Sequence, residues 1–251
     1  MNPKEKMRSG KKAVGTMLRL VRNPAICYLA RNAGLDYVML DCEHGNYNFE
    51  TIHDICITAN ALGISGFVRV PVGSKDYISR TLDAGAGGVM VPMVETREQA
   101  ETLVKYANFG PIGQRGFNAT GPHTEYRGGK HSEVMANCNA AVLAIAQIET
   151  RTAIENIDVI AAVEGIDALL IGPNDLSISL GVPGDLMNQI ELDAIAKVAA
   201  ACRKHDKFFG LHAGAALLEK FAKELNLVMS LGDLDLLAQG LSGVKKIADA
   251  L

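Results

Sequence analysis

Short apolar runs alternate along the chain with longer segments of mixed polarity. The runs are almost wholly apolar, without alternation between apolar and polar residues, which is typical of parallel strands buried on both faces. Eight of them predict strands, at residues 13–20, 36–41, 66–70, 87–93, 140–149, 167–172, 208–213 and 227–232. The pattern favours an α/β protein with a parallel sheet.

The segments between the runs carry helix signals. Asn23–Pro24 supplies an N-cap and a first-turn proline, and Thr96 with Gln99 reads as a capping box. By contrast, residues 110–130 are rich in Gly and Pro, lack a sustained period and predict a long functional loop. Helices are predicted at 24–34, 49–62, 75–85, 97–107, 152–162, 191–205 and 234–250. One more helix is predicted to end at residue 225.

Eight strand-helix units in 251 residues predict a single-domain (β/α)8 TIM barrel over residues 1–251, because that fold needs about 250 residues. The alternative is an open, doubly wound sheet with a glycine-rich nucleotide turn. The only dense glycine cluster, Gly85–Gly88, lies between a helix and the next strand, which is the wrong side of the unit for that turn. The barrel is therefore preferred.

The composition narrows the possible partners. A net charge of −3 without a basic stripe argues against a nucleic-acid partner. Five scattered cysteines without a CxxC pair indicate neither a disulfide framework nor a zinc knuckle, which favours a reducing, cytoplasmic location. No run reaches the roughly 18 apolar residues of a membrane span, so neither export nor membrane insertion is expected.

A barrel of this type builds its active site at the carboxyl ends of its strands, so the polar residues that end each run become the candidates. They are Arg19, Asp41, Glu43, His44, Arg69, Gln147, Glu149, Asn174, Asp175 and His212. Glu149 and Asp175 follow neighbouring strands, and Gln147 lies beside them. Such an oxygen-rich set suits Mg2+ or Mn2+, although both carboxylates could instead cap the helices that follow.

Three further candidates differ in how strongly they indicate function. Arg69 stands inside an apolar strand, so its guanidinium needs a partner, either structural or an anionic substrate. His44 could be functional or a turn residue bonded to Asp41, and His212 is open to either interpretation. No predicted strand contains or ends in Lys, which argues against a Schiff-base aldolase and leaves a metal as the electron sink for carbon–carbon chemistry.

Six segments occur in one chain and in order: LDCEHG, VRVP, LDAGAGGVMVPMVETREQAE, GQRG, AIAQIET and LLIGPNDLSISLG. Together they resemble the HpcH/HpaI family of metal-dependent pyruvate aldolases, from about Gly15 to Gly232. The resemblance implies reversible cleavage of a 4-hydroxy-2-oxo acid to pyruvate and an aldehyde, with Mg2+, Mn2+ or Co2+ as cofactor. It also implies a homo-hexamer, a trimer of dimers that exchange the C-terminal helix.

The resemblance assigns one group of residues to the metal and the oxo acid. Glu149 and Asp175 match the metal ligands, and Gln147 matches a residue beside the bound oxo acid. The backbone from Gly172 and Pro173 to Asn174 and Asp175 matches the site of the pyruvate carboxylate, which the N-terminus of the following helix would favour.

The resemblance assigns a second group to catalysis. Arg69 matches the residue that steadies the developing enolate oxygen, and His44 matches the base that removes the 4-hydroxyl proton. Asp83 matches the carboxylate that raises this basicity, and Asp41 is expected to orient the same histidine.

The resemblance does not predict the identity of the aldehyde portion, because residues 45–48, Gly-Asn-Tyr-Asn, depart from the Ala-Pro-Asn-Asp of well-known family members. Residues 113–127, with Arg115 and Arg127, are expected to line or cover that portion, unless these are ordinary surface arginines. A second function, from the synthase class, would join an oxo acid to an acyl-CoA as a citrate synthase does.

Overall fold

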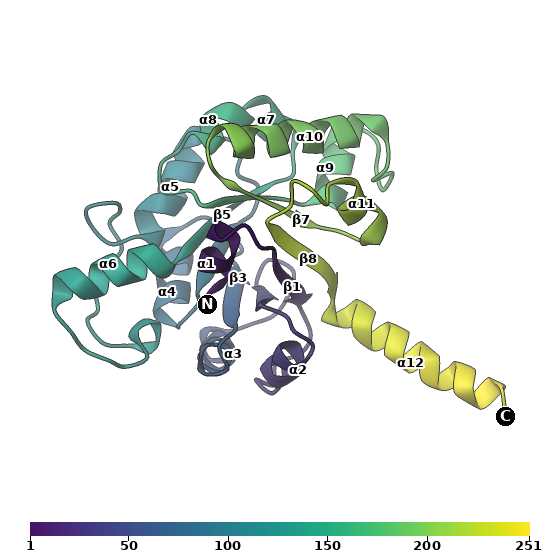
Figure 1. Ribbon diagram of the computed structural model, residues 1–251, viewed down its shortest axis with the longest axis horizontal. Coiled ribbons are helices and arrows are strands. Elements are labelled where there is room, and N and C mark those ends of the chain that lie inside the picture. Colours follow the sequence, from purple (N-terminus) through teal and green to yellow (C-terminus); the bar gives the residue numbers. More distant parts are fainter.

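Eight parallel strands close into a barrel in the order β1 to β8, so the predicted fold is confirmed. The computed structural model describes residues 1–251 (Figure 1). All eight predicted strands are present, most of them shorter by a few residues. They are β1 (Ala13–Leu18), β2 (Tyr37–Asp41), β3 (Ser65–Arg69), β4 (Gly88–Val91), β5 (Leu143–Ile148), β6 (Ala168–Ile171), β7 (Phe208–His212) and β8 (Leu227–Gly232).

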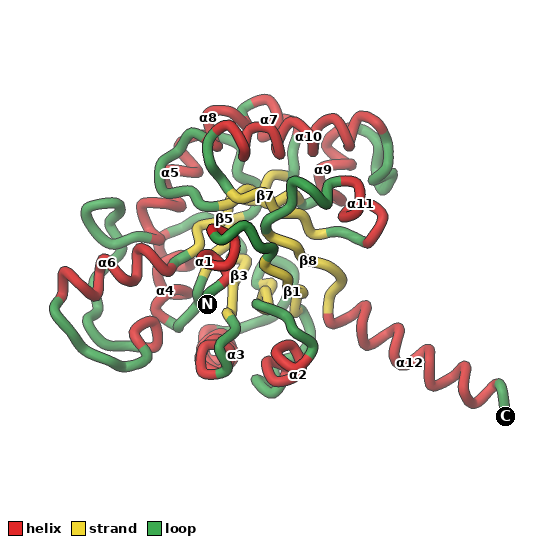
Figure 2. Tube along the Cα trace, viewed as in Figure 1, coloured by secondary structure: helices red, strands yellow, loops and turns green.

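Helices surround the barrel, and Figure 2 shows them in red around the yellow strands. The predicted capping box is confirmed, since Thr96 accepts a hydrogen bond from the Gln99 N–H and Gln99 accepts one from the Thr96 N–H. The helices are α1 (Pro3–Arg8), α2 (Ile26–Asn32), α3 (Phe49–Ala61), α4 (Lys75–Asp83), α5 (Arg97–Ala107), α6 (His131–Ala141), α7 (Arg151–Glu155), α8 (Ile157–Ala161), α9 (Pro173–Leu180), α10 (Gln189–Lys204), α11 (Ala215–Lys220) and α12 (Asp233–Asp249), with one 3-10 turn at Pro122–Thr124.

The structure corrects the prediction at several helices. The single helix expected at 152–162 is two short ones, α7 and α8, separated at Asn156. Helices α1 and α6 are not predicted, and α9 is predicted only as the helix that follows Asp175, without bounds. Only Val134 is buried in α6, so this helix lacks the apolar stripe that identifies a helix in a sequence. Ala140 and Ala141 end α6, and the strand predicted from 140 therefore begins only at Leu143.

Two apolar layers hold the barrel together. Alternate strand residues such as Val38 and Leu40 pack outward against the helices, whereas Tyr37 and Met39 fill the interior. Tyr37 stacks on Phe67 with ring centroids 4.8 Å apart. A side chain on Gly15 would lie within 2.6 Å of the Tyr37 ring, so this position requires glycine.

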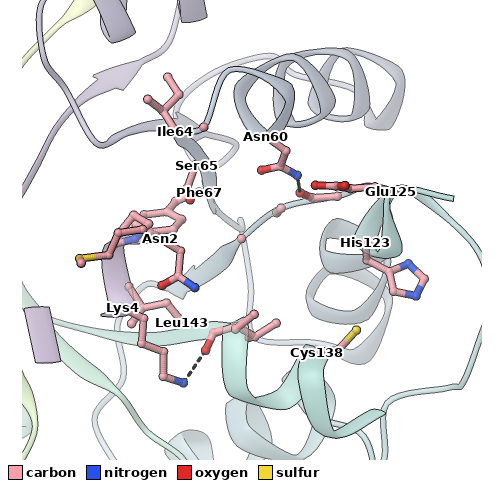
Figure 3. Close-up of a pocket in the computed structure, with 18 of the residues that line it drawn as sticks. Asn2, Lys4, Asn60, Ile64, Ser65, Phe67, His123, Glu125, Cys138 and Leu143 are labelled. Carbon is pink, nitrogen blue, oxygen red and sulfur yellow. Dashed lines mark hydrogen bonds between the residues drawn. The ribbon is translucent and has the colours of Figure 1, made fainter. Parts of the chain in front are cut away.

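Helix α1 closes the end of the barrel at which the strands begin. Met7 joins the interior cluster, and the buried Lys4 donates to the Val142 carbonyl at 2.7 Å and pairs with Asp167 at 2.8 Å. A cavity of about 310 Å3 lies beside α1 at this end (Figure 3). None of the strand-end candidates lines that cavity, because they lie at the opposite end of the barrel.

Helix α12 extends away from the barrel (Figure 1). Asp233 at its start is its only buried residue, and the helix leaves a row of large apolar side chains exposed. They are Leu234, Leu236, Leu237, Leu241, Val244 and Ile247. No helix in the chain combines the length and the apolarity needed to cross a membrane.

Glu191, in the first turn of α10, is a buried carboxylate without a partner. The residue is fully buried, and neither side-chain oxygen accepts a hydrogen bond. Burial raises the pKa of Glu191 from 4.5 to about 7, because a buried and unpaired negative charge is costly. The folded state therefore binds this proton more tightly than the unfolded state does.

We expect Glu191→Gln to raise the melting temperature at pH 8 and to change it little at pH 5. Since the folded-state pKa lies above the unfolded value, the wild-type chain loses stability as pH rises from about 4.5 through 7, by on the order of 3 kcal/mol in total. Melting curves at both pH values measure the difference. Glu155→Gln, which changes an exposed carboxylate, is the control, and equal gains at both pH values would contradict the explanation.

Candidate active site

The carboxyl ends of the strands surround a cavity of about 440 Å3, as the barrel rule predicts. Its lining includes side chains from β1, β3, β5 and β7, from the loop after β2 and from the first turn of α9. The polar side chains among them are Arg19, His44, Arg69, Gln147, Asp175 and His212, with Asn174 and Asp235 beside them. Residues far apart in the sequence are thus brought to one rim.

Arg69 and Asp41 form a buried ion pair between the ends of β3 and β2, where the two residues are register partners. Arg69 Nε donates to Asp41 Oδ1 at 2.9 Å, and its terminal Nη2 donates to Oδ2 at 2.6 Å. Burial alone would raise the pKa of Asp41, but the bonds from Arg69 lower it below its ordinary value. This two-point contact fixes the plane of the guanidinium.

The remaining nitrogen of Arg69 faces the cavity. Nη1 lies 2.9 Å from Glu43 Oε2 and 3.4 Å from Gln147 Oε1. One guanidinium therefore links the loop after β2 to the end of β5. Burial raises the pKa of Glu43, while the charge of Arg69 opposes that shift.

Asp41 contacts His44 through the backbone and not through the ring. The N–H groups of Glu43 and His44 donate to Asp41 Oδ1 at 3.1 and 3.2 Å, which fixes the turn after β2. The side chain of His44 is 57% exposed, and its Nε2 lies 3.9 Å from Glu43 Oε2. The backbone of His44 therefore forms the predicted turn with Asp41, whereas its imidazole is exposed and lines the cavity.

Glu149 is buried at the centre of the oxygen-rich set. Its Oε1 accepts from the Met93 N–H at 2.8 Å, and its Oε2 accepts from the Gln147 amide. Burial raises the pKa of Glu149 to about 7, and the carboxylates of Glu43 and Asp175 add to the shift. A side chain on Gly172 would lie 2.4 Å from Glu149 Oε2, so glycine is required for this approach.

The chain from Gly172 to Asp175 begins helix α9. Pro173 occupies the first helical position, and the Asn174 carbonyl accepts from the Ser177 hydroxyl at 2.7 Å. The N–H groups in the first turn of a helix lack partners within it and favour an anion. The backbone predicted to hold a carboxylate therefore borders the cavity beside Asp175.

The donor set fits a hard divalent cation with few protein ligands. No group of three or more His, Cys, Asp or Glu side chains in the chain is placed to hold a metal ion. The negative charges of Glu149 and Asp175 nevertheless repel each other, and this repulsion adds to the effect of burial on the pKa of Glu149. A cation between two such carboxylates would relieve that repulsion, and Mg2+ commonly takes one or two carboxylates with water and substrate oxygens.

Asp83 lies away from this rim. It is the last residue of α4, which returns the chain to the start of β4, so it lies at the end of the barrel opposite His44. Arg115 Nη2 pairs with Asp83 Oδ1 at 2.7 Å, and the Arg115 guanidinium stacks over the Phe109 ring at 4.6 Å. Asp83 therefore has no contact with His44 within one chain.

The segment 113–127 lies at the same end of the barrel as Asp83, because it belongs to the connection that runs from α5 through α6 to β5. This segment borders the cavity beside α1, which is also lined by Asn60 from the end of α3. Arg127 is 81% exposed and pairs with Glu125 at 2.9 Å. The expectation that this segment lines the aldehyde side is therefore not met within one chain.

Sequence reasoning missed Met93 entirely. Its φ of 53° is unusual for a residue other than glycine, and this conformation accompanies the N–H contact with Glu149. Nothing in the segment VPMVE signals that geometry. The role of Arg19 and His212 as cavity residues, in contrast, follows from their positions at strand ends.

The comparisons with known proteins agree with the predicted resemblance. The family model described as HpcH/HpaI aldolase/citrate lyase matches residues 17–238. A 4-hydroxy-4-methyl-2-oxoglutarate aldolase from Chaetomium globosum is 36% identical over 202 residues, which cover 80% of this chain and 74% of the relative.

Solved structures are similar over nearly the whole chain. The HpcH/HpaI aldolase from Desulfitobacterium hafniense has a TM-score of 0.93 at 35% identity, covering 98% of this chain and 96% of that one. The citrate synthase SbnG has a TM-score of 0.88 at 26% identity, covering 98% and 97%. The chain therefore belongs to the HpcH/HpaI aldolase/citrate lyase family and, like its aldolase relatives, is a carbon–carbon lyase.

Proposed function

We propose that this enzyme performs reversible aldol cleavage of a 4-hydroxy-2-oxo acid to pyruvate and an aldehyde. The observation that carries the proposal is the arrangement of His44, Arg69 and Gln147 around one cavity, with the buried Glu149 accepting a hydrogen bond from the Gln147 amide. Five free cysteines suit a reducing compartment, so the proposed location is the cytoplasm.

The proposed cofactor is a divalent metal ion, Mg2+, Mn2+ or Co2+, held by Glu149 and Asp175. Bound there, such an ion would supply Lewis-acid polarisation of the 2-oxo group. Gln147 holds Glu149 in place by its amide hydrogen bond. The first-turn N–H groups of α9 would bind the carboxylate of the oxo acid.

Arg69 would stabilise the charge that develops on the 2-oxo oxygen. Its plane is fixed in advance by Asp41, so the donor at Nη1 needs no reorganisation during the reaction. His44 would take the proton from the 4-hydroxyl group as the carbon–carbon bond breaks. Its exposed ring can approach a substrate held against Arg69.

Asp83 could raise the basicity of His44 only if it came from another subunit, since the two residues lie at opposite ends of one barrel. The proposed homo-hexamer, a trimer of dimers, offers such a neighbour. The exposed apolar row of α12 supports it, because an unpartnered stripe of this kind indicates a protein interface. A second copy that exchanges α12 would cover the row.

A second candidate function is condensation of an oxo acid with an acyl-CoA. The similarity to the citrate synthase SbnG supports this second candidate. Incubation with oxaloacetate and acetyl-CoA would release free thiol if the enzyme worked in this way. Pyruvate formation from a 4-hydroxy-2-oxo acid without thiol release from the CoA ester would favour the aldolase.

We expect His44→Ala and Glu149→Ala each to lower kcat by at least about 100-fold, because one removes the base and the other a metal ligand. Pyruvate release from a 4-hydroxy-2-oxo acid, followed by a coupled assay, measures this.

Exhaustive chelation should abolish the activity of the unmodified enzyme, and Mg2+, Mn2+ or Co2+ should restore it. Full turnover after chelation would contradict the metal assignment.

We expect a mixture of His44→Ala and Asp83→Asn subunits to recover activity that neither variant has alone, because mixed assemblies contain some sites with both residues intact. Activity is measured before and after subunit exchange. The control is a mixture of His44→Ala with Arg69→Met, two residues of the same rim, for which no intact site can form. Equal behaviour of the two mixtures would contradict action of Asp83 across subunits.

We expect the double substitution Leu241→Asp and Ile247→Asp in α12 to reduce the oligomer to smaller species, because it places two charges in an apolar interface. Light scattering after size-exclusion chromatography measures the mass. Gln239→Asp adds a charge to the same helix without removing an apolar contact and serves as the control. An unchanged mass for the double variant would rule out α12 as the interface.

A further inference from the structure

Arg115 is a buried arginine of the GQRG segment, and the active-site cavity does not use it. Its side chain is 1% exposed, and it lines the cavity beside α1 rather than the one at the carboxyl ends of the strands. A guanidinium is costly to bury and is therefore paired with an anion. The anion here is Asp83, whose side chain is 38% exposed, so the arginine lies inside and the carboxylate lies at the surface.

The contact between Arg115 and Asp83 leaves half of the carboxylate free. Arg115 Nε and Nη2 both donate to Asp83 Oδ1, at 3.1 and 2.7 Å, and no group of the chain donates to Oδ2. The ion pair at the opposite rim differs, because Arg69 donates to both oxygens of the fully buried Asp41. Asp83 therefore keeps one accessible oxygen that can accept a hydrogen bond from outside its own chain.

The segment that carries Arg115 is held firmly in place. The guanidinium stacks over the ring of the fully buried Phe109 at 4.6 Å. The Phe109 N–H donates to Asn139 Oδ1 at 2.8 Å, and the Phe109 carbonyl accepts from Asn139 Nδ2 at 3.0 Å. The Arg115 N–H donates to the Asn108 carbonyl at 2.9 Å. These contacts fix the plane of the guanidinium and, through it, the position of the Asp83 carboxylate.

The position of Asp83 is unfavourable for the stability of its own helix. Asp83 is the last residue of α4, where unpaired carbonyl groups carry partial negative charge and repel a carboxylate. His123 lines the same cavity as Arg115, but burial and the charge of Arg115 lower the pKa of His123, so its ring is largely uncharged near pH 7. Arg115 is the cation that pairs with Asp83. A carboxylate kept at such a position with one oxygen free has the chemistry of a group that acts outside its own chain.

We propose that Arg115 is a positioning residue that directs Oδ2 of Asp83 to the imidazole of His44 in a neighbouring subunit. The inference rests on the proposed aldolase function and on the proposed action of Asp83 across subunits. Asp83 would accept the ring N–H of His44, which orients the imidazole and stabilises its protonated form after it takes the 4-hydroxyl proton. Arg115 touches neither the substrate nor His44 and acts only through Asp83.

The first test compares Arg115→Ala with Asp83→Asn in pyruvate release from a 4-hydroxy-2-oxo acid. We expect Arg115→Ala to lower kcat by at least about 10-fold, because a carboxylate that is no longer held loses its fixed geometry toward the base. KM should stay within about threefold, since neither residue touches the bound oxo acid. The double variant should be no slower than Asp83→Asn alone, because Arg115 acts only through Asp83.

The second test mixes variant subunits and measures activity before and after subunit exchange. Arg115→Ala mixed with His44→Ala should recover activity, because some sites then combine an intact His44 with an intact Arg115–Asp83 pair. Arg115→Ala mixed with Asp83→Asn should recover none, because every subunit then lacks one half of that pair. A merely structural defect at Arg115 would not produce this pattern.

Arg97→Ala is the matched control, because it breaks an exposed arginine–carboxylate pair, with Glu101 at 2.7 Å, and should leave kcat unchanged. Arg115→Lys keeps the charge but lacks the planar set of donors, so it should also lower kcat by about 10-fold. It replaces the alanine variant in both tests if melting temperature and mass show that the alanine variant does not fold and assemble. An unchanged kcat would overturn the proposal, as would recovery in the mixture with Asp83→Asn or losses that multiply in the double variant.

The levels of inference fail in different ways. If the unmodified enzyme releases pyruvate from no 4-hydroxy-2-oxo acid at any metal concentration, the aldolase function is wrong. If it releases pyruvate but Asp83→Asn keeps full kcat, or does not recover activity with His44→Ala, the action of Asp83 across subunits is wrong and the role of Arg115 falls with it. If Asp83→Asn behaves as expected and Arg115→Ala does not, only the role of Arg115 is wrong.

Discussion

Closure of eight parallel strands is the constraint on which the rest of the molecule depends. Each strand is hydrogen-bonded on both sides and buried on both faces, so its residues are nearly all apolar. The acidic, basic and imidazole side chains within strands are Asp41, Arg69 and His212, and each is the last residue of its strand. Parallel closure brings these ends to one rim, where polar groups can be packed without disturbing the barrel.

The Arg69–Asp41 pair shows how that rim is stabilised. Removing two charges from water is costly, and the bidentate contact across adjacent strands offsets much of the cost. The same contact leaves Nη1 directed at Glu43 and Gln147. A residue that joins two strands thus also presents a fixed positive charge to the cavity, so a substitution at Arg69 would change the stability of the rim together with the charge of the cavity.

The barrel could be predicted from the sequence because burial on both faces leaves a pattern that tolerates little exception. Helix α6 could not, because only Val134 is buried in it and no apolar stripe results. The rim residues followed from the barrel rule, whereas the conformation of Met93 left no mark on the sequence. Asp83 was assigned by resemblance alone. Its place at the end of α4 puts it at the opposite end of the barrel from His44, because that helix returns the chain to the start of β4.

The charges around the cavity would make a divalent cation and a proton compete for Glu149. Asp175 and Asp235 line the cavity together with Arg19 and Arg69, and the charges of Glu43 and Glu149 interact with that of Asp175. Burial, together with the negative charges of Glu43 and Asp175, raises the pKa of Glu149 to about 7. A ligand carboxylate must lose its proton before it binds a metal ion. Near neutral pH the same negative charges therefore favour either a proton on Glu149 or a divalent cation beside it, and the affinity for the cation should rise as the proton leaves.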